Sequence, residues 1–90
     1  MSMIEREITV ENSLGIHARP ASLIVQTANA YASDIWLEKD ETSANAKSIM
    51  SVMMLVADHG SKVRIRAEGT DASDALDAIE TLFRNKFNEA

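Results

Sequence analysis

Apolar and polar residues alternate along residues 4–10 and 62–68, which is the pattern of a half-buried β-strand. The second segment is the clearer one, because Val63, Ile65 and Ala67 alternate with charged side chains. A strand places every second side chain on the same face of its sheet. We therefore expect a sheet with one buried face and one face in water.

Two more strands are expected in the middle of the chain. Ile35 and Leu37 point inward in this alternation, while Trp36 and Glu38 point to water. A charged turn follows and leads into a short strand at residues 42–46. Together with the first two segments, these strands would complete the sheet.

Two other segments, which begin at Ala18 and at residue 71, repeat apolar residues every three or four positions, the spacing of an amphipathic helix. A third helix is expected from residue 48. The last stripe predicts one long helix and consists of Ala75, Leu76, Ile79, Leu82, Phe83 and Phe87. The element order βαββαβα predicts an α+β domain with two layers, an antiparallel sheet covered on one side by helices.

The helix expected at residues 48–56 has apolar side chains around most of its circumference. A domain of 90 residues cannot bury all of them. One explanation is an exposed patch that binds a partner, because flexible methionine side chains suit an adaptable docking surface. The other explanation is a short helix that packs deep in the core. The pattern alone favours neither.

Composition narrows the possible functions. The chain has 90 residues, no cysteine and a net charge of −5. We expect one domain over residues 1–90 that works through an exposed surface, in the reducing cytoplasm. The negative charge disfavours nucleic acid, which proteins bind chiefly with Lys and Arg. The first residues resemble neither a signal peptide nor a membrane span, so protein partners are the default expectation.

Candidate chemistry lies in one short segment, where Gly15, His17, Arg19 and Pro20 surround the start of the first expected helix. A histidine ring nitrogen is a nucleophile, and the first amides of a helix, here those of Ala18 and Arg19, attract anions. Gly15 allows an unusual backbone conformation, and Pro20 is tolerated in a first turn, although it disfavours helical geometry at Arg19. The segment predicts a phosphate-handling site; the alternative is that His17 is an ordinary surface residue or a weak cap.

Two stretches of the chain resemble a known family. The segment LGIHARPAS occupies residues 14–22, and the segment KSIMSVM occupies residues 47–53. Both resemble signatures of HPr, the histidine-containing phosphocarrier family of the bacterial phosphoenolpyruvate-dependent phosphotransferase system, and the resemblance extends over nearly the whole chain. It implies an open-faced β-sandwich in which four antiparallel strands lie under three helices.

The same resemblance implies roles for individual residues. His17 would accept a phosphoryl group on Nδ1 from phosphorylated enzyme I and pass it to an enzyme IIA, and Arg19 would offset the phosphoryl charge. Such a protein is a phosphohistidine carrier rather than a stand-alone turnover enzyme, with no cofactor and no metal ion. The implied docking surface for these partners consists of Ala18, Ser22, Gln26, Ile49, Met50 and Met53.

Ser48 has two compatible interpretations. A serine before an apolar run is a favoured N-cap, worth about 1 kcal/mol. In the family that the chain resembles, this serine is also a target of the HPr kinase/phosphorylase, and its phosphate would add about −1.5 to −2 charges beside the apolar helix. The chain departs from the common family pattern at Ala46 and Ser51, where glycine is frequent, so Ser51 is a second candidate hydroxyl.

Two alternatives remain open from the sequence. A nitrogen-related regulatory carrier would have the same chemistry at His17 in another pathway. A small α/β interaction module would bind a partner through its methionine-rich helix and leave His17 without a chemical role. A hydrolytic enzyme is disfavoured, because no second acid or base lies beside His17 in the sequence. We further expect a monomer without membrane insertion, and a solvated loop position for His59.

Overall fold

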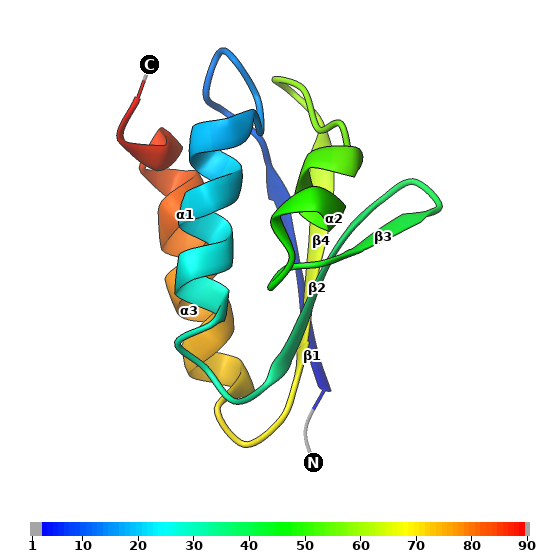
Figure 1. Cartoon of the computed structure of the whole chain (residues 1–90), viewed down its shortest axis with the longest axis vertical. Helices are drawn as coiled ribbons and strands as arrows, with labels where there is room; N and C mark the ends of the chain where they lie inside the picture. The colour runs from blue at the N-terminus through cyan, green and yellow to red at the C-terminus, as the bar shows by residue number, and fades with distance from the viewer. Residues whose placement is uncertain (1–2, 90) are drawn as a thin grey trace.

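The computed structural model describes residues 3–89 and has the expected order of elements (Figure 1). The elements are β1 (Met3–Thr9), α1 (Ala18–Ala28), β2 (Asp34–Lys39), β3 (Thr42–Asn45), α2 (Ile49–Met54), β4 (Lys62–Glu68), α3 (Ala72–Arg84) and the short 3₁₀ helix η1 (Lys86–Asn88). The four strands form one antiparallel sheet in the order β1-β4-β2-β3. The predicted α+β fold is therefore confirmed.

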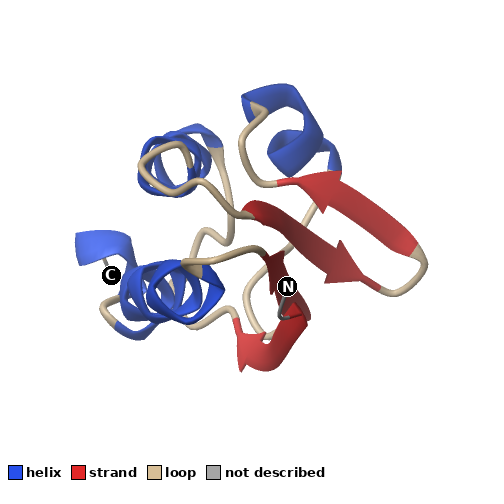
Figure 2. Ribbon diagram, turned by 90° about the horizontal axis from the view of Figure 1, so that it is seen from below, coloured by secondary structure: helices blue, strands red, loops and turns tan. Residues whose placement is uncertain are grey.

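Helices cover one face of this sheet. Helices α1 and α3 contact each other, α3 packs on the central strands and on β1, and α2 contacts α1 and β3 (Figure 2). The core lies between the two layers, where Val63, Ile65 and Ala67 of β4 are buried, as their alternation predicted. Ile24 of α1 and Leu76 of α3 are also fully buried. Each such Leu or Ile contributes about 1.5–3 kcal/mol relative to an exposed position.

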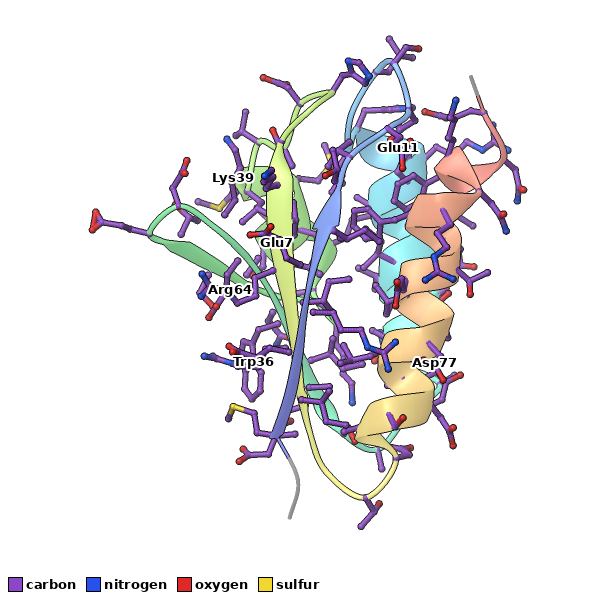
Figure 3. All side chains as sticks on the ribbon, turned by 180° about the vertical axis from the view of Figure 1, so that it is seen from behind. Glu7, Glu11, Trp36, Lys39, Arg64 and Asp77 are labelled. Carbon is purple, nitrogen blue, oxygen red and sulfur yellow. The ribbon has the colours of Figure 1, made fainter. Side chains whose placement is uncertain are left out.

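The other face of the sheet is open and carries charged pairs (Figure 3). The Arg66 guanidinium lies over the ring of Trp36, 4.9 Å from its centroid, and pairs with Glu38 at 3.2 Å. Arg64 also reaches Glu38, at 3.3 Å, and lies opposite Glu7 in the β1–β4 register. Exposed ion pairs contribute only about 0–1 kcal/mol each, so the buried face supplies most of the stability of the sheet.

The last helix is shorter than its apolar stripe predicted. Helix α3 ends at Arg84, and Phe87 lies beyond it in η1, so the prediction of one helix through Phe87 is wrong. Lys86, Phe87 and Asn88 have φ angles of 52°, 54° and 59°, in the left-handed region. The Phe87 ring is nonetheless buried, edge-on to Phe83 with their centroids 4.9 Å apart. The burial of Phe87 was predicted correctly, but the backbone reaches this position by a left-handed turn.

Asp71 joins the turn after α1 to the start of α3. Its carboxylate accepts hydrogen bonds from the backbone amides of Ala32 and Ser33, both at 2.9 Å, and from the hydroxyl of Ser33. The Ser33 hydroxyl and these amides stabilise the ionised form and hold the pKa of Asp71 below its ordinary value.

We therefore expect Asp71 to make the stability depend on pH under acidic conditions. Its depressed pKa stabilises the fold above the unfolded-state pKa of about 3.9, and this contribution is lost as the pH falls through the lower folded-state pKa. Asp71→Asn should be less stable than the parent protein at pH 7, and the difference should shrink below about pH 4. Urea unfolding at pH 7 and pH 3 measures both values, with the exposed Asp74→Asn as control. An equal difference at both pH values would contradict this prediction.

Candidate functional site

His17 is the N-cap residue of α1. Its backbone is extended, with φ −91° and ψ −166°, and its carbonyl accepts a hydrogen bond from the Ala21 amide at 3.0 Å. The imidazole side chain is 37% exposed. The helix begins at Ala18, so Pro20 lies in its first turn without displacing the start of the helix past Arg19.

The N-terminus of α1 is able to hold an anion. The amides of Ala18 and Arg19 precede the first intrahelical hydrogen bond, and the His17 side chain caps none of these amides. No acidic residue lies in the first turn, and the Arg19 side chain is exposed. The helix dipole and the guanidinium therefore place positive potential beside the imidazole.

Gly15 fixes the loop that leads into His17. Its φ is +68°, and a Cβ at this position would lie 2.5 Å from the carbonyl oxygen of Ala57. The next residue, Ile16, is buried and donates its amide to the same carbonyl at 2.8 Å. The loop is thus attached to the chain that follows α2. Only glycine fits here without moving the backbone on which His17 is mounted.

The imidazole has a partner that the sequence did not indicate. Nε2 of His17 lies 2.9 Å from Oε1 of Glu89, and the same oxygen accepts the side-chain amide of Asn12 at 2.9 Å. The hydrogen bonds from His17 and Asn12, followed by the charge of Arg19, lower the pKa of Glu89. The carboxylate therefore lies within electrostatic reach of both predicted site residues. No local spacing links His17 to a residue 72 positions away, so no pattern in the sequence could have revealed this contact.

Most apolar side chains of α2 are exposed, which excludes the explanation that this helix packs deep in the core. Within α2 only Val52 is buried, and Met50 and Met54 are each 72% exposed. Three exposed apolar residues do not belong to the docking surface that the resemblance implied: Met54, Val56 and Leu14, which precedes Gly15 in the loop attached to Ala57. We define the apolar patch as Leu14, Ile49, Met50, Met53, Met54 and Val56.

The predicted docking residues of α1 lie one helical turn apart, in the order Ala18, Ser22 and Gln26. Ala18 and Gln26 are exposed and Ser22 is half-buried, with the Gln26 side-chain amide donating to the Ser22 hydroxyl at 3.2 Å. They form a polar strip that begins next to His17. This strip and the apolar patch are presented by two helices that contact each other.

Ser48 lies away from His17. It is the N-cap of α2, and its hydroxyl accepts the Ser51 amide at 3.4 Å. Asn29, the C-cap of α1, reaches the carbonyl of Lys47 at 3.4 Å. The 11 residues of α1 span about 16 Å, so the length of this helix separates Ser48 from the imidazole. The structure places Ser48 at the start of the apolar patch, not at the histidine.

The second histidine, His59, is exposed in the turn before β4. Within residues 3–89 there is no group of side chains arranged to hold a metal ion, no enclosed pocket, and no helix long and apolar enough to cross a membrane. The candidate site is therefore an open surface around His17.

A βαββαβα sandwich that presents an exposed histidine and an arginine at a helix N-terminus is typical of small phosphocarrier proteins. A family model described as "PTS HPr component phosphorylation site" matches residues 4–85. The chain therefore belongs to the HPr family and is a phosphocarrier of the phosphotransferase system. The alternative of an interaction module without phosphoryl chemistry is not supported.

Individual relatives agree with this assignment. Phosphocarrier protein HPr of Treponema pallidum (strain Nichols) is 49% identical over 87 residues, covering 97% of this chain and 99% of the relative. HPr of Xylella fastidiosa (strain Temecula1) is 45% identical over 97% of this chain and 98% of its own. The crystal structure of HPr-C-His from Thermoanaerobacter tengcongensis superposes with a TM-score of 0.93 at 46% identity, covering 97% of this chain and 98% of that chain.

Proposed function

We propose that His17 is the residue that carries the phosphoryl group, accepting it from phosphorylated enzyme I and delivering it to an enzyme IIA. The observation that carries this proposal is the partly exposed imidazole at the N-cap of α1, beside the amides of Ala18 and Arg19. No other histidine has this environment, because His59, the second of two in the chain, lies in a turn.

The transfer follows from the geometry of the site. A ring nitrogen of His17 attacks phosphorus and forms a P–N bond, while the bond to the donor group of enzyme I breaks and leaves its electron pair with that group. The Ala18 and Arg19 amides and the Arg19 guanidinium stabilise the negative charge on the phosphoryl oxygens. Phosphoryl transfer requires mainly positioning and charge stabilisation, so an open surface suffices when the partner closes over it.

We propose that partners dock on the apolar patch and on the polar strip of α1. Because each transfer involves one imidazole, we propose that the protein acts as a monomer. We also propose that it acts in the cytoplasm, a reducing compartment in which proteins rarely use disulfide bonds, because the chain has no cysteine. One solved relative is described as an HPr dimer from Thermoanaerobacter tengcongensis, with a TM-score of 0.78 and 48% identity. An equilibrium between both forms would be visible in the sedimentation of this chain.

Val56 offers a test of the patch that separates docking from stability. Its φ of 51° is unfavourable for a β-branched residue, and Nζ of Lys39 donates to its carbonyl at 3.0 Å. Val56→Gly should stabilise the fold by about 0.5–1 kcal/mol, because relief of left-handed strain exceeds the entropy cost of glycine. The same change should weaken binding to enzyme I about 2–3-fold, because it removes exposed apolar area.

Urea unfolding and titration with enzyme I measure these two effects of Val56→Gly. Val56→Ala is the matched control, since it removes the same methyl groups but retains Cβ and the strain. A glycine variant that is less stable than the alanine variant would contradict the prediction.

We further propose that a kinase of the HPr kinase/phosphorylase type modifies Ser48. Its hydroxyl is half-buried at the start of α2, next to the exposed Ile49 and Met50. A phosphate would sit favourably at a helix N-terminus but would place about two negative charges beside the docking patch. Since Ser48 is separated from His17 by the length of α1, we expect it to act on docking and not on the imidazole.

Incubation with enzyme I, Mg²⁺ and labelled phosphoenolpyruvate tests the proposed function. We expect label that is lost in acid and retained in alkali, as for a phosphoramidate and unlike a phosphoserine. When protein phosphorylated beforehand at Ser48 is the substrate of enzyme I, its KM should be raised, with little change in kcat. Absence of label with an active, matched enzyme I would overturn the proposal for His17.

A further inference from the structure

Sulfur lies at the surface in the part of the chain that the structure describes. Four methionines belong to residues 3–89, and all four are exposed: Met3 at 51%, Met53 at 41%, and Met50 and Met54 at 72% each. The buried apolar side chains are instead those of Ile, Leu, Val, Ala and Phe. Since the chain has no cysteine, these thioethers are the oxidisable sulfur groups of this surface.

Three of the exposed methionines lie close together on α2. Met53 and Met54 follow Met50 by three and four positions, so the three side chains are neighbours on the helix surface. The buried residue of this helix is Val52. The methionines therefore form much of the apolar patch without belonging to the core, so a change in their chemistry alters the docking surface and leaves the core packing in place.

We propose that Met50, Met53 and Met54 are sites of reversible oxidation to methionine sulfoxide, and that the oxidised patch binds enzyme I more weakly while the fold stays intact. This inference rests on the proposed docking of enzyme I at the apolar patch. The oxidant belongs to the peroxide class, of which hydrogen peroxide is the simplest member.

The oxidation is a transfer of one oxygen atom. A lone pair of the thioether sulfur attacks one oxygen of hydrogen peroxide, so that an S–O bond forms and the O–O bond breaks. The departing hydroxide takes the O–O electron pair and the proton of the transferred oxygen, and leaves as water. Sulfur loses two electrons and the peroxide gains two. Two thiols of a methionine sulfoxide reductase reverse the step, because they become a disulfide and release the oxygen as water.

The sulfoxide changes the patch from apolar to polar. Methionine is flexible and polarisable, and it suits an adaptable docking surface for that reason. Its sulfoxide has a strongly hydrated S–O group, which loses this hydration whenever a partner covers the patch. Docking is therefore weakened, whereas the imidazole of His17 at the N-cap of α1 keeps its structure. We expect oxidation to act on KM and not on kcat.

Three full-length proteins test the proposal. They are the parent, a variant that combines Met50→Leu, Met53→Leu and Met54→Leu, and the control Met3→Leu. Leucine is apolar and close to methionine in volume and helix propensity, but it cannot form a sulfoxide. Met1 is common to all three proteins. Each is treated with hydrogen peroxide, freed of it, and used as the substrate of untreated enzyme I, and the KM after treatment is divided by the KM before treatment.

We expect this KM ratio to be about 10 for the parent, with kcat unchanged. Peptide mapping should place the added oxygen on the three methionines of α2, and methionine sulfoxide reductases for both epimers should return the ratio to about 1. The combined leucine variant should have a ratio of about 1, whatever its KM before treatment. Met3→Leu should have the same ratio as the parent. Urea unfolding should give the same midpoint for the oxidised and the reduced parent, because the three side chains are exposed.

The proposal is overturned if the α2 methionines acquire no oxygen, or if they do and the KM of the parent does not rise. It is also overturned if the combined leucine variant has the ratio of the parent, or if oxidation unfolds the protein. Failure of the proposed function looks different. Untreated parent protein would then acquire no label from enzyme I, or Met50→Asp in the unoxidised protein would leave the KM unchanged.

Discussion

Replacing His17 by alanine is expected to reduce labelling by enzyme I at least about 1,000-fold, because the nucleophile of the transfer is removed. The amides of Ala18 and Arg19 would remain, but they only stabilise charge and cannot form the P–N bond. Since the His17 side chain is 37% exposed and makes no capping hydrogen bond, the variant should retain its fold. Labelling and circular dichroism on the same sample separate loss of chemistry from loss of structure.

His59→Ala is the matched control, since it makes the same substitution at the other histidine of the chain. It lies in an exposed turn, so labelling should remain within about 2-fold of the parent value. Full labelling of His17→Ala would show that another residue carries the phosphoryl group. A loss of labelling in both variants would point to a general defect and not to one site.

Placing a carboxylate in the apolar patch is expected to give the second largest effect. Met50 is 72% exposed, so Met50→Asp should leave the fold intact and yet bury a charge whenever a partner covers the patch. We expect the KM of this protein as substrate of enzyme I to rise about 30–150-fold, the range of a lost interface anchor of about 2–3 kcal/mol. The kcat of enzyme I at saturating concentrations of the variant should change little, because His17 is untouched.

Met3→Asp is the control for Met50→Asp. Met3 is 51% exposed in β1 and is not part of the patch, and the substitution is chemically identical. Its KM should stay close to the parent value. If both variants raise the KM equally, the effect is one of net charge. If neither does, the patch is not the docking surface.

The fold was readable from the sequence because its signals are local. The alternation around Val63, Ile65 and Ala67 gives β4 its buried face directly, and the bounds of that strand agree with the prediction. The tail was predicted incorrectly for a physical reason. Phe83 and Phe87 have helical spacing and are both buried, but the backbone between them turns left-handed. Apolar periodicity reports burial and does not report backbone handedness.

The candidate site also has one part that the sequence predicts and another part that only the structure shows. His17, Arg19 and the free helix amides belong to one contiguous segment, so their chemistry could be inferred from order alone. The pairing of His17 with Glu89 and Asn12 depends on the packing of the tail against the first loop, which no local pattern encodes. The exposure of the methionines also needed the structure, because an apolar helix surface is compatible with a core position or a docking position.

The central claim is that the phosphoryl group resides on one ring nitrogen of one exposed histidine. Phosphorylation of ¹⁵N-labelled protein by enzyme I, followed by ³¹P–¹⁵N coupling and peptide mapping, locates this bond directly. The account predicts a single phosphoryl group on Nδ1 of His17, with Nε2 still protonated. A phosphoryl group on Nε2 of His17, on His59 or on a serine would contradict it.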